Sequence, residues 1–116
     1  MKPNSCLFRA VSQLVKHQFG VPNPSSDIFD KYNTGDGINI DICVPIINES
    51  LEKYGIRVKA VYCHYDEPSR FSSPEVLRPP QFVPSPCIVI TDSHAEALIA
   101  TNTQVDGIAA IVLAKI

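Results

Sequence analysis

The sequence predicts an α+β fold in which an N-terminal helix packs on a C-terminal antiparallel β-sheet. Apolar residues recur at helical spacing in residues 6–19 and again from about residue 40 to 54. Residues 56–63 alternate as a half-buried strand does, and three further strand-like segments follow residue 86. Helices grouped before strands favour an α+β arrangement. We expect one domain over residues 1–116, because a chain of this length buries a single core.

The first helix is expected over residues 6–19, CLFRAVSQLVKHQF. The apolar stripe of this segment includes Leu7, Val11 and Leu14, and polar side chains lie outside the stripe. Gly20 follows the last helical position, as is common at helix ends. This segment therefore predicts an amphipathic helix with one face toward the sheet.

Residues 23–37 contain the turn-forming residues of a surface connection. Within them, SDIFDKY predicts a short helix capped by Ser26. A second long helix is expected over about 40–54, with Asn39 or Asp41 as its cap.

The strands are expected at 56–63, 87–91, 94–100 and about 105–115. The last two are close enough in sequence for an antiparallel hairpin across the turn TNTQ, which would make 94–100 a central strand. Between the first two strands, residues 64–86 hold six prolines and predict a long irregular segment. Such segments are often functional, so we interpret this one as a cleft wall or lid.

Composition excludes several classes of protein. The net charge is −2 and the Lys and Arg residues are scattered, which argues against a nucleic-acid surface. No apolar run approaches the roughly 20 residues that span a bilayer, and no secretory signal pattern is present. We therefore expect a cytoplasmic protein with no membrane or nucleic-acid partner; the sequence does not indicate its oligomeric state.

The four cysteines do not form a metal or disulfide pattern. There is no C-x-x-C pair, so we expect no metal and no cofactor. Cys43, Cys63 and Cys87 lie in apolar stretches and are interpreted as small buried hydrophobic residues. Cys6 is different because it begins the first helix, where unpaired amides and the helix dipole favour a thiolate. Its position alone is equally consistent with a nucleophile and with a packing residue.

A cysteine nucleophile needs an imidazole base, and the chain has three histidines. His17 lies 11 residues along the same helix, which at 1.5 Å per residue is about 16 Å from Cys6 and too far to act. His64 is expected at the surface, where a strand enters the proline-rich segment. His94 begins a predicted strand directly after the turn TDS, a position that would hold its ring at the edge of a cleft. We therefore take His94 as the candidate base.

The base also needs an acceptor that holds its ring. Four residues near His94 in sequence are candidates, and the sequence does not decide among them. Asp106 falls on the return strand of the proposed hairpin, Asn102 lies in the turn, and Glu96 shares the strand face of His94. Asp92 is more simply explained as a turn residue.

The order of these residues resembles that of the papain-like cysteine peptidases. The segments MKPNSCLFRAV and SHAEALIATNTQVDG are similar to small phage and bacterial relatives of the bacteriocin-processing double-glycine peptidases. That resemblance implies a papain-like fold and a thiol peptidase, with a peptide or protein as substrate. It also implies Cys6 as nucleophile, His94 as general base, Asp106 as the orienting residue and Asn4 as an oxyanion donor.

A second resemblance is to the ovarian-tumour (OTU) deubiquitinases, whose CLFRA sequence after the nucleophile stands here at 6–10. Their ending, His-x-Asn or His-x-Asp, is similar to His94-Ala95-Glu96. The chain departs from that family at Glu96 and at Pro3, where the family has an aspartate. It departs from the processing peptidases in having little chain before Cys6 for their oxyanion glutamine.

These departures leave three alternatives to a thiol peptidase of the first kind. One is a catalytically inactive module on the same fold that binds a peptide or partner. Another is an OTU-like deubiquitinase. A third is one domain of a larger viral or phage polyprotein that acts in cis.

Overall fold

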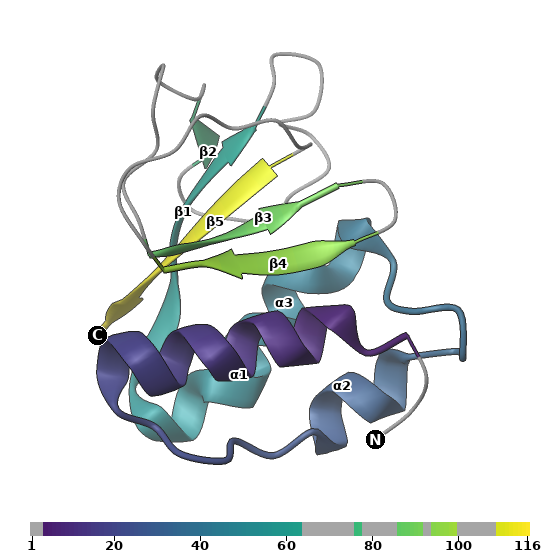
Figure 1. The fold of residues 1–116 in the computed structure, drawn as a ribbon, viewed down its shortest axis with the longest axis horizontal. Coiled ribbons are helices and arrows are strands. Elements are labelled where there is room, and N and C mark those ends of the chain that lie inside the picture. Colours follow the sequence, from purple (N-terminus) through teal and green to yellow (C-terminus); the bar gives the residue numbers. More distant parts are fainter. Residues whose placement is uncertain (1–3, 64–75, 78–85, 92–93, 100–108) are drawn as a thin grey trace.

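The structure is a computed structural model that describes residues 4–63, 76–77, 86–91, 94–99 and 109–116. Figure 1 shows its helices on one side of a twisted sheet. The elements, in chain order, are α1 (Cys6–Phe19), α2 (Asp27–Tyr32), the 3-10 helix η1 (Ile40–Ile42), α3 (Cys43–Leu51), the 3-10 helix η2 (Glu52–Tyr54), β1 (Ile56–Cys63), β2 (Val76–Leu77), β3 (Cys87–Ile90), β4 (Ala95–Leu98) and β5 (Ala109–Lys115).

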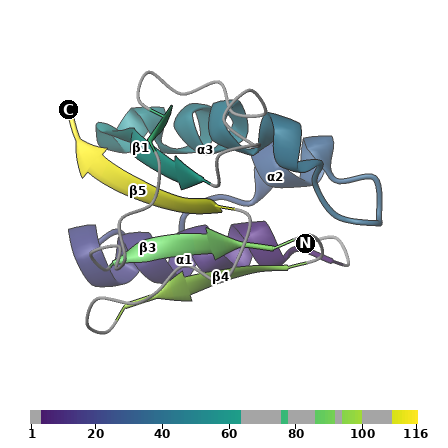
Figure 2. The ribbon, with the colours of Figure 1, turned by 90° about the horizontal axis from the view of Figure 1, so that it is seen from above.

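The five strands form one sheet with the order β2-β1-β5-β3-β4. Strand β2 pairs with β1 in parallel, and the other neighbours are antiparallel. Helix α3 packs against β1, whereas α1 packs against β3 and β4, so the two helices cover different halves of one face (Figure 2). The predicted α+β class, with an N-terminal helix and an antiparallel sheet, is confirmed.

The core lies between the helices and this face of the sheet. The apolar stripe predicted for α1 is buried there, and α3 contributes a second buried face around Ile47. Both α1 and the 40–54 helix have the bounds expected from the sequence, although the ends of the latter are 3-10 turns. The side chain of Asn39 accepts a hydrogen bond from the amide of Asp41 at 2.9 Å, which confirms Asn39 as the cap.

The short helix α2 is also where the sequence predicts it, but Ser26 does not cap it through its side chain. The Ser26 hydroxyl bonds the carboxylate of Asp30 at 3.0 Å, and Ser25 accepts from the amide of Asp27. Phe29 of α2 is buried against Phe8 of α1, with 5.4 Å between the ring centroids. This contact holds α2 beside the first turns of α1.

The predicted hairpin between the last two strands is wrong. Strand β3 lies between β4 and β5, and β4 is the edge strand rather than a central one. The burial pattern explains this order: β5 is buried along most of its length, as a central strand requires, while β4 exposes Glu96. The short sequence distance between β4 and β5 favours a hairpin between them, but a strand that is buried on both faces, as β5 is, favours a central position with two partner strands.

The proline-rich segment is not wholly irregular, because β2 adds a short parallel strand beside β1, with Val61 opposite Val76. The rest of the proposed lid lies outside the described residues. In the part of the chain that the structure describes, no helix is long and apolar enough to cross a membrane.

Candidate functional site

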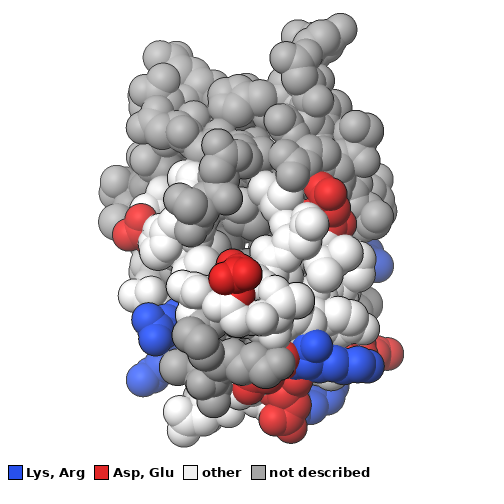
Figure 3. All heavy atoms as spheres, turned by 90° about the vertical axis from the view of Figure 1, so that its right-hand side faces the viewer, with Lys and Arg blue, Asp and Glu red and all other residues white. Residues whose placement is uncertain are grey.

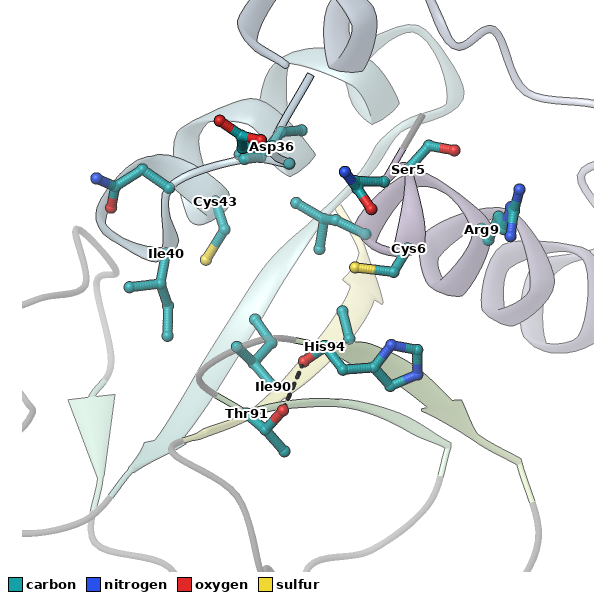
Figure 4. A pocket seen from close by; sticks show the side chains of 15 residues that line it. Ser5, Cys6, Arg9, Asp36, Ile40, Cys43, Ile90, Thr91 and His94 are labelled. Atoms are coloured by element: carbon teal, nitrogen blue, oxygen red, sulfur yellow. Dashed lines mark hydrogen bonds between the residues drawn. The ribbon is translucent and has the colours of Figure 1, made fainter. Parts of the chain in front are cut away.

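Helix α1 begins at Cys6, as the sequence predicts. Ser5 occupies the N-cap position, and its carbonyl accepts the amide of Arg9 at 3.0 Å. The amides of Cys6 and Leu7 belong to the first turn, where helical geometry provides no intrahelical acceptor. Cys6 is half-buried, and its sulfur points into a pocket (Figure 4). A thiol at this place has backbone donors beside it.

The pocket has a volume of about 550 Å³ and lies where four segments meet. These are the start of α1, the connection that leads into α3, the end of β3 and the start of β4. A volume of this size is within the range of small-molecule and peptide side-chain sites. Its lining residues are Asn4, Ser5, Cys6, Leu7, Arg9, Asp36, Gly37, Ile38, Asn39, Ile40, Cys43, Ile90, Thr91, His94 and Ala95.

His94 lies in the same pocket as Cys6, directly before β4. The carbonyl of His94 accepts the backbone amide of Thr91 at 2.8 Å and the hydroxyl of Thr91 at 3.2 Å, which closes the β3–β4 turn. In Figure 4 the exposed imidazole points to the right, below α1, whereas the sulfur of Cys6 points to the left, toward the middle of the pocket. The packing of α1 on β4 places both residues on the lining of one pocket, although the sulfur and the imidazole point to different sides.

The turn before Cys6 is tied to the 33–37 loop. Asn4 has a left-handed backbone with φ of 57°, and its side-chain amide donates to the carbonyl of Gly35 at 2.7 Å. Asn33, only 2% exposed, accepts the amides of Gly35 and Gly37 on its Oδ1 at 2.8 and 3.1 Å. Its Nδ2 donates to the carbonyl of Asn4 at 3.4 Å. We call these four residues the asparagine clasp.

Sequence reasoning missed Asn33, which it treated as part of a surface connection. The signal was present in the letters NTGDG, because an asparagine followed by glycines at the second and fourth positions is suited to an Asx-type turn. Gly35 and Gly37 have φ of 102° and 100°, a conformation that side chains rarely adopt. Asn4, expected to be an oxyanion donor, uses one Nδ2 proton to hold Gly35.

The remaining candidates are not brought together with Cys6 and His94 among the described residues. Asp106, Asn102, Asp92 and His64 all lie outside the part of the chain that the structure describes, so the choice of an orienting residue stays a prediction. Glu96 is exposed on β4 and does not line the pocket. His17 is exposed in the last turn of α1, at the opposite end of the helix from Cys6.

The other three cysteines are buried, as predicted. Burial raises the pKa of the Cys87 thiol above its usual value, which disfavours the reactive thiolate. Cys43 lines the pocket from the first position of α3, with its sulfur toward the cavity (Figure 4), a role that the sequence did not indicate. Within the described ranges, no group of three His, Cys, Asp or Glu side chains is arranged to hold a metal ion.

The pocket combines an apolar wall with charged residues at its rim. Ile40 and Ile90 point into it, and Asp36 and Arg9 stand on different sides of it (Figure 4). Figure 3 shows that the described surface around a hollow on this face is mostly uncharged, apart from an acidic side chain just below the hollow, and that Lys and Arg lie toward the lower left, the lower right and the right edge. The arrangement suits an apolar group bound beside a thiol and an imidazole.

No known family model matches this chain, and neither the curated proteins nor the solved structures include a significant match.

Proposed function

We propose that this protein is a papain-like thiol hydrolase that cleaves peptide or isopeptide bonds. One observation carries the proposal: a cysteine in the first turn of α1 and a histidine at the entry to β4 line one pocket. Each residue alone has an ordinary structural explanation. A nucleophile beside backbone donors, with an imidazole on the facing wall, is the arrangement that acyl transfer requires.

The residues divide the reaction between them. The Cys6 thiolate attacks the substrate carbonyl carbon, and the tetrahedral oxygen receives hydrogen bonds from first-turn amides such as that of Cys6. The C–N bond breaks as His94 donates a proton to the leaving amine, which gives a thioester on Cys6. His94 then takes a proton from water, whose oxygen attacks the thioester and releases the acid and the thiolate. By the resemblance to the processing peptidases, Asp106 orients the His94 ring.

The pocket wall supports an apolar residue on the acyl side of the cleaved bond. Ile38 and Ile40 are partly buried and line the pocket together with the buried Ile90, so a bound aliphatic side chain would remove more of their apolar surface from water. Burying one such side chain stabilises a complex by about 1.5–3 kcal/mol. We therefore expect substrates with Leu, Ile or Val next to the cleaved bond to be preferred.

Alkylation tests the nucleophile without knowledge of the substrate. Iodoacetamide at pH 7 should modify Cys6 of the folded protein at least about tenfold faster than the same thiol in urea, as is expected of a catalytic cysteine. Peptide mass spectrometry assigns each modified cysteine, and Cys87 should react last. A folded Cys6 that reacts no faster than the unfolded thiol contradicts the assignment.

Turnover separates an enzyme from a binding module. Fluorescently labelled casein should be cleaved by the wild-type protein and by Cys87→Ala, whereas Cys6→Ala should lose activity by about a thousandfold or more. A Cys6→Ala protein that cleaves casein at the wild-type rate rules out the proposed nucleophile. Ubiquitin with an electrophilic C-terminus adds a second arm, because labelling of Cys6 by this probe would indicate an isopeptidase of the OTU kind.

A further inference from the structure

We propose that Asn33 is a positioning residue that fixes the turn before Cys6, so that the nucleophile and its neighbouring amides are held in place. This inference rests on the proposed function, since it concerns the same nucleophile. It concerns a residue 27 positions away from Cys6 in the sequence that does not line the pocket.

The burial of Asn33 is the first step. Only 2% of its surface is exposed, and a buried amide is costly unless its donors and acceptor are satisfied. Its Oδ1 accepts two backbone amides of its own loop, Gly35 at 2.8 Å and Gly37 at 3.1 Å. These bonds fix the backbone conformation of the 33–37 loop. That conformation includes a positive φ at Gly35 and Gly37, which glycine adopts without steric cost.

The second step is the connection from that loop to the nucleophile. The Nδ2 of Asn33 reaches the carbonyl of Asn4, and the side chain of Asn4 returns to the carbonyl of Gly35 at 2.7 Å. Asn4 is two residues before Cys6 and has φ of 57°, a conformation that Asn tolerates better than most residues. The clasp therefore holds the chain where it turns into α1.

The third step is the consequence for chemistry. The backbone conformation of residues 4–6 determines the positions of the Cys6 Sγ and of the first-turn amides. The 33–37 loop, in turn, continues into the pocket wall at Gly37 and Ile38. Displacement of reacting groups by about 1 Å costs up to a hundredfold in rate. Loss of Asn33 should thus lower the reactivity of Cys6 in a protein that is still folded.

The experiment compares Asn33→Ala with Asn48→Ala. Asn48 is a matched control because its Oδ1 also accepts a backbone amide, that of Val58 at 2.7 Å, but it joins α3 to β1 and does not line the pocket. Asn33→Ala loses three side-chain hydrogen bonds to backbone and Asn48→Ala loses the one to Val58, so both variants should lose some stability. Measurements are made at a temperature where circular dichroism shows each variant to be folded.

Three readouts separate positioning from general stability. Asn33→Ala should slow iodoacetamide alkylation of Cys6 by about tenfold or more relative to Asn48→Ala, and should lower kcat on labelled casein more than it raises KM. Backbone hydrogen exchange should increase in the peptide that contains residues 4–7 in Asn33→Ala only. Asn33→Asp, which keeps the acceptor for the two glycine amides but lacks the donor to Asn4, should restore order in the 33–37 loop without restoring Cys6 reactivity.

The outcomes distinguish this inference from the proposed function. A wild-type Cys6 without enhanced reactivity overturns the proposed function. An activated wild-type thiol that reacts equally fast in Asn33→Ala and in Asn48→Ala overturns only the positioning role of Asn33. If Asn33→Asp regains the wild-type alkylation rate, the bond to Asn4 is not the connection that matters.

Discussion

The two walls of the pocket are held in different ways. On the cysteine wall, the asparagine clasp joins the turn before α1 to a loop about 30 residues later, through side chains of Asn4 and Asn33. On the histidine wall, His94 precedes an edge strand and is fixed through its own carbonyl by Thr91. Long-range polar contacts thus hold the turn before Cys6, the proposed nucleophile, whereas His94 depends on one local turn.

For the proposed reaction, this difference indicates that the histidine wall makes the movement that brings His94 and Cys6 together. The sulfur of Cys6 and the imidazole of His94 point to different sides (Figure 4), so the proposed reaction requires the two to come together when substrate binds. Catalytic hydrogen bonds often tighten only in the substrate complex. An exposed side chain at the end of an edge strand can make that movement at low cost in packing.

The largest effect is expected from removal of the imidazole. His94→Ala should lower kcat on labelled casein by about a hundredfold to ten-thousandfold, because no other described residue that lines the pocket is a histidine. His17→Ala is the matched control, since His17 is exposed in the last turn of α1 and its loss should leave kcat unchanged. Equal activity of the two variants would contradict the assignment of His94.

The apolar wall should give the next largest effect. Ile40→Asp should lower kcat/KM for peptides with Leu beside the cleaved bond by about tenfold to a hundredfold, mainly through KM, since it places a charge in the pocket. Ile42→Asp alters the same 3-10 helix at a side chain that is 38% exposed and does not line the pocket. If both substitutions have the same effect on KM, this wall does not bind the substrate side chain.

A smaller effect is expected from the turn that carries His94. Thr91→Val removes the hydroxyl that donates to the His94 carbonyl at 3.2 Å but keeps the backbone bond at 2.8 Å. One such hydrogen bond is worth about 0.5–1.5 kcal/mol, so kcat should fall by roughly twofold to tenfold. Thr91→Ser retains the hydroxyl and should behave as wild type; a loss in Thr91→Ser equal to that in Thr91→Val would point to packing instead.

The smallest effect should follow from Glu96→Gln. Glu96 is exposed and lies outside the pocket lining, so kcat and KM should both stay within about twofold of wild type, as for an ordinary surface substitution. Steady-state kinetics on labelled casein measures both constants. A tenfold or greater loss of kcat would instead make Glu96 the residue that orients His94.

Local patterns predicted the elements well because each depends on nearby residues. The stripe of α1, the glycine after it and the Asn39 cap are all decided within one or two helical turns, and the structure has them where the sequence indicates. Cys6 and His94 were singled out because a helix start and a strand start are local features, and both line one pocket; their catalytic roles stay a prediction.

Strand order and the asparagine clasp could not be predicted in the same way. The order β5-β3-β4 depends on which strands are buried on both sides, and that is decided by packing with distant segments. The burial of Asn33 likewise depends on Asn4, which is 29 positions earlier. The burial of a turn-forming asparagine cannot be read from the local sequence, because asparagine is common both in exposed turns and in buried ones.

The strand register also decides where additional polypeptide can be attached. Lys115 pairs with Ile56, and Ile116 bonds Gly55, so the C-terminus leaves at the end of the sheet opposite to the β3–β4 turn and the pocket (Figure 1). Asn4, in contrast, is itself a pocket residue. An affinity tag or a fused domain placed after Ile116 should therefore leave access to Cys6 open, whereas one placed before Asn4 would join the chain beside the pocket.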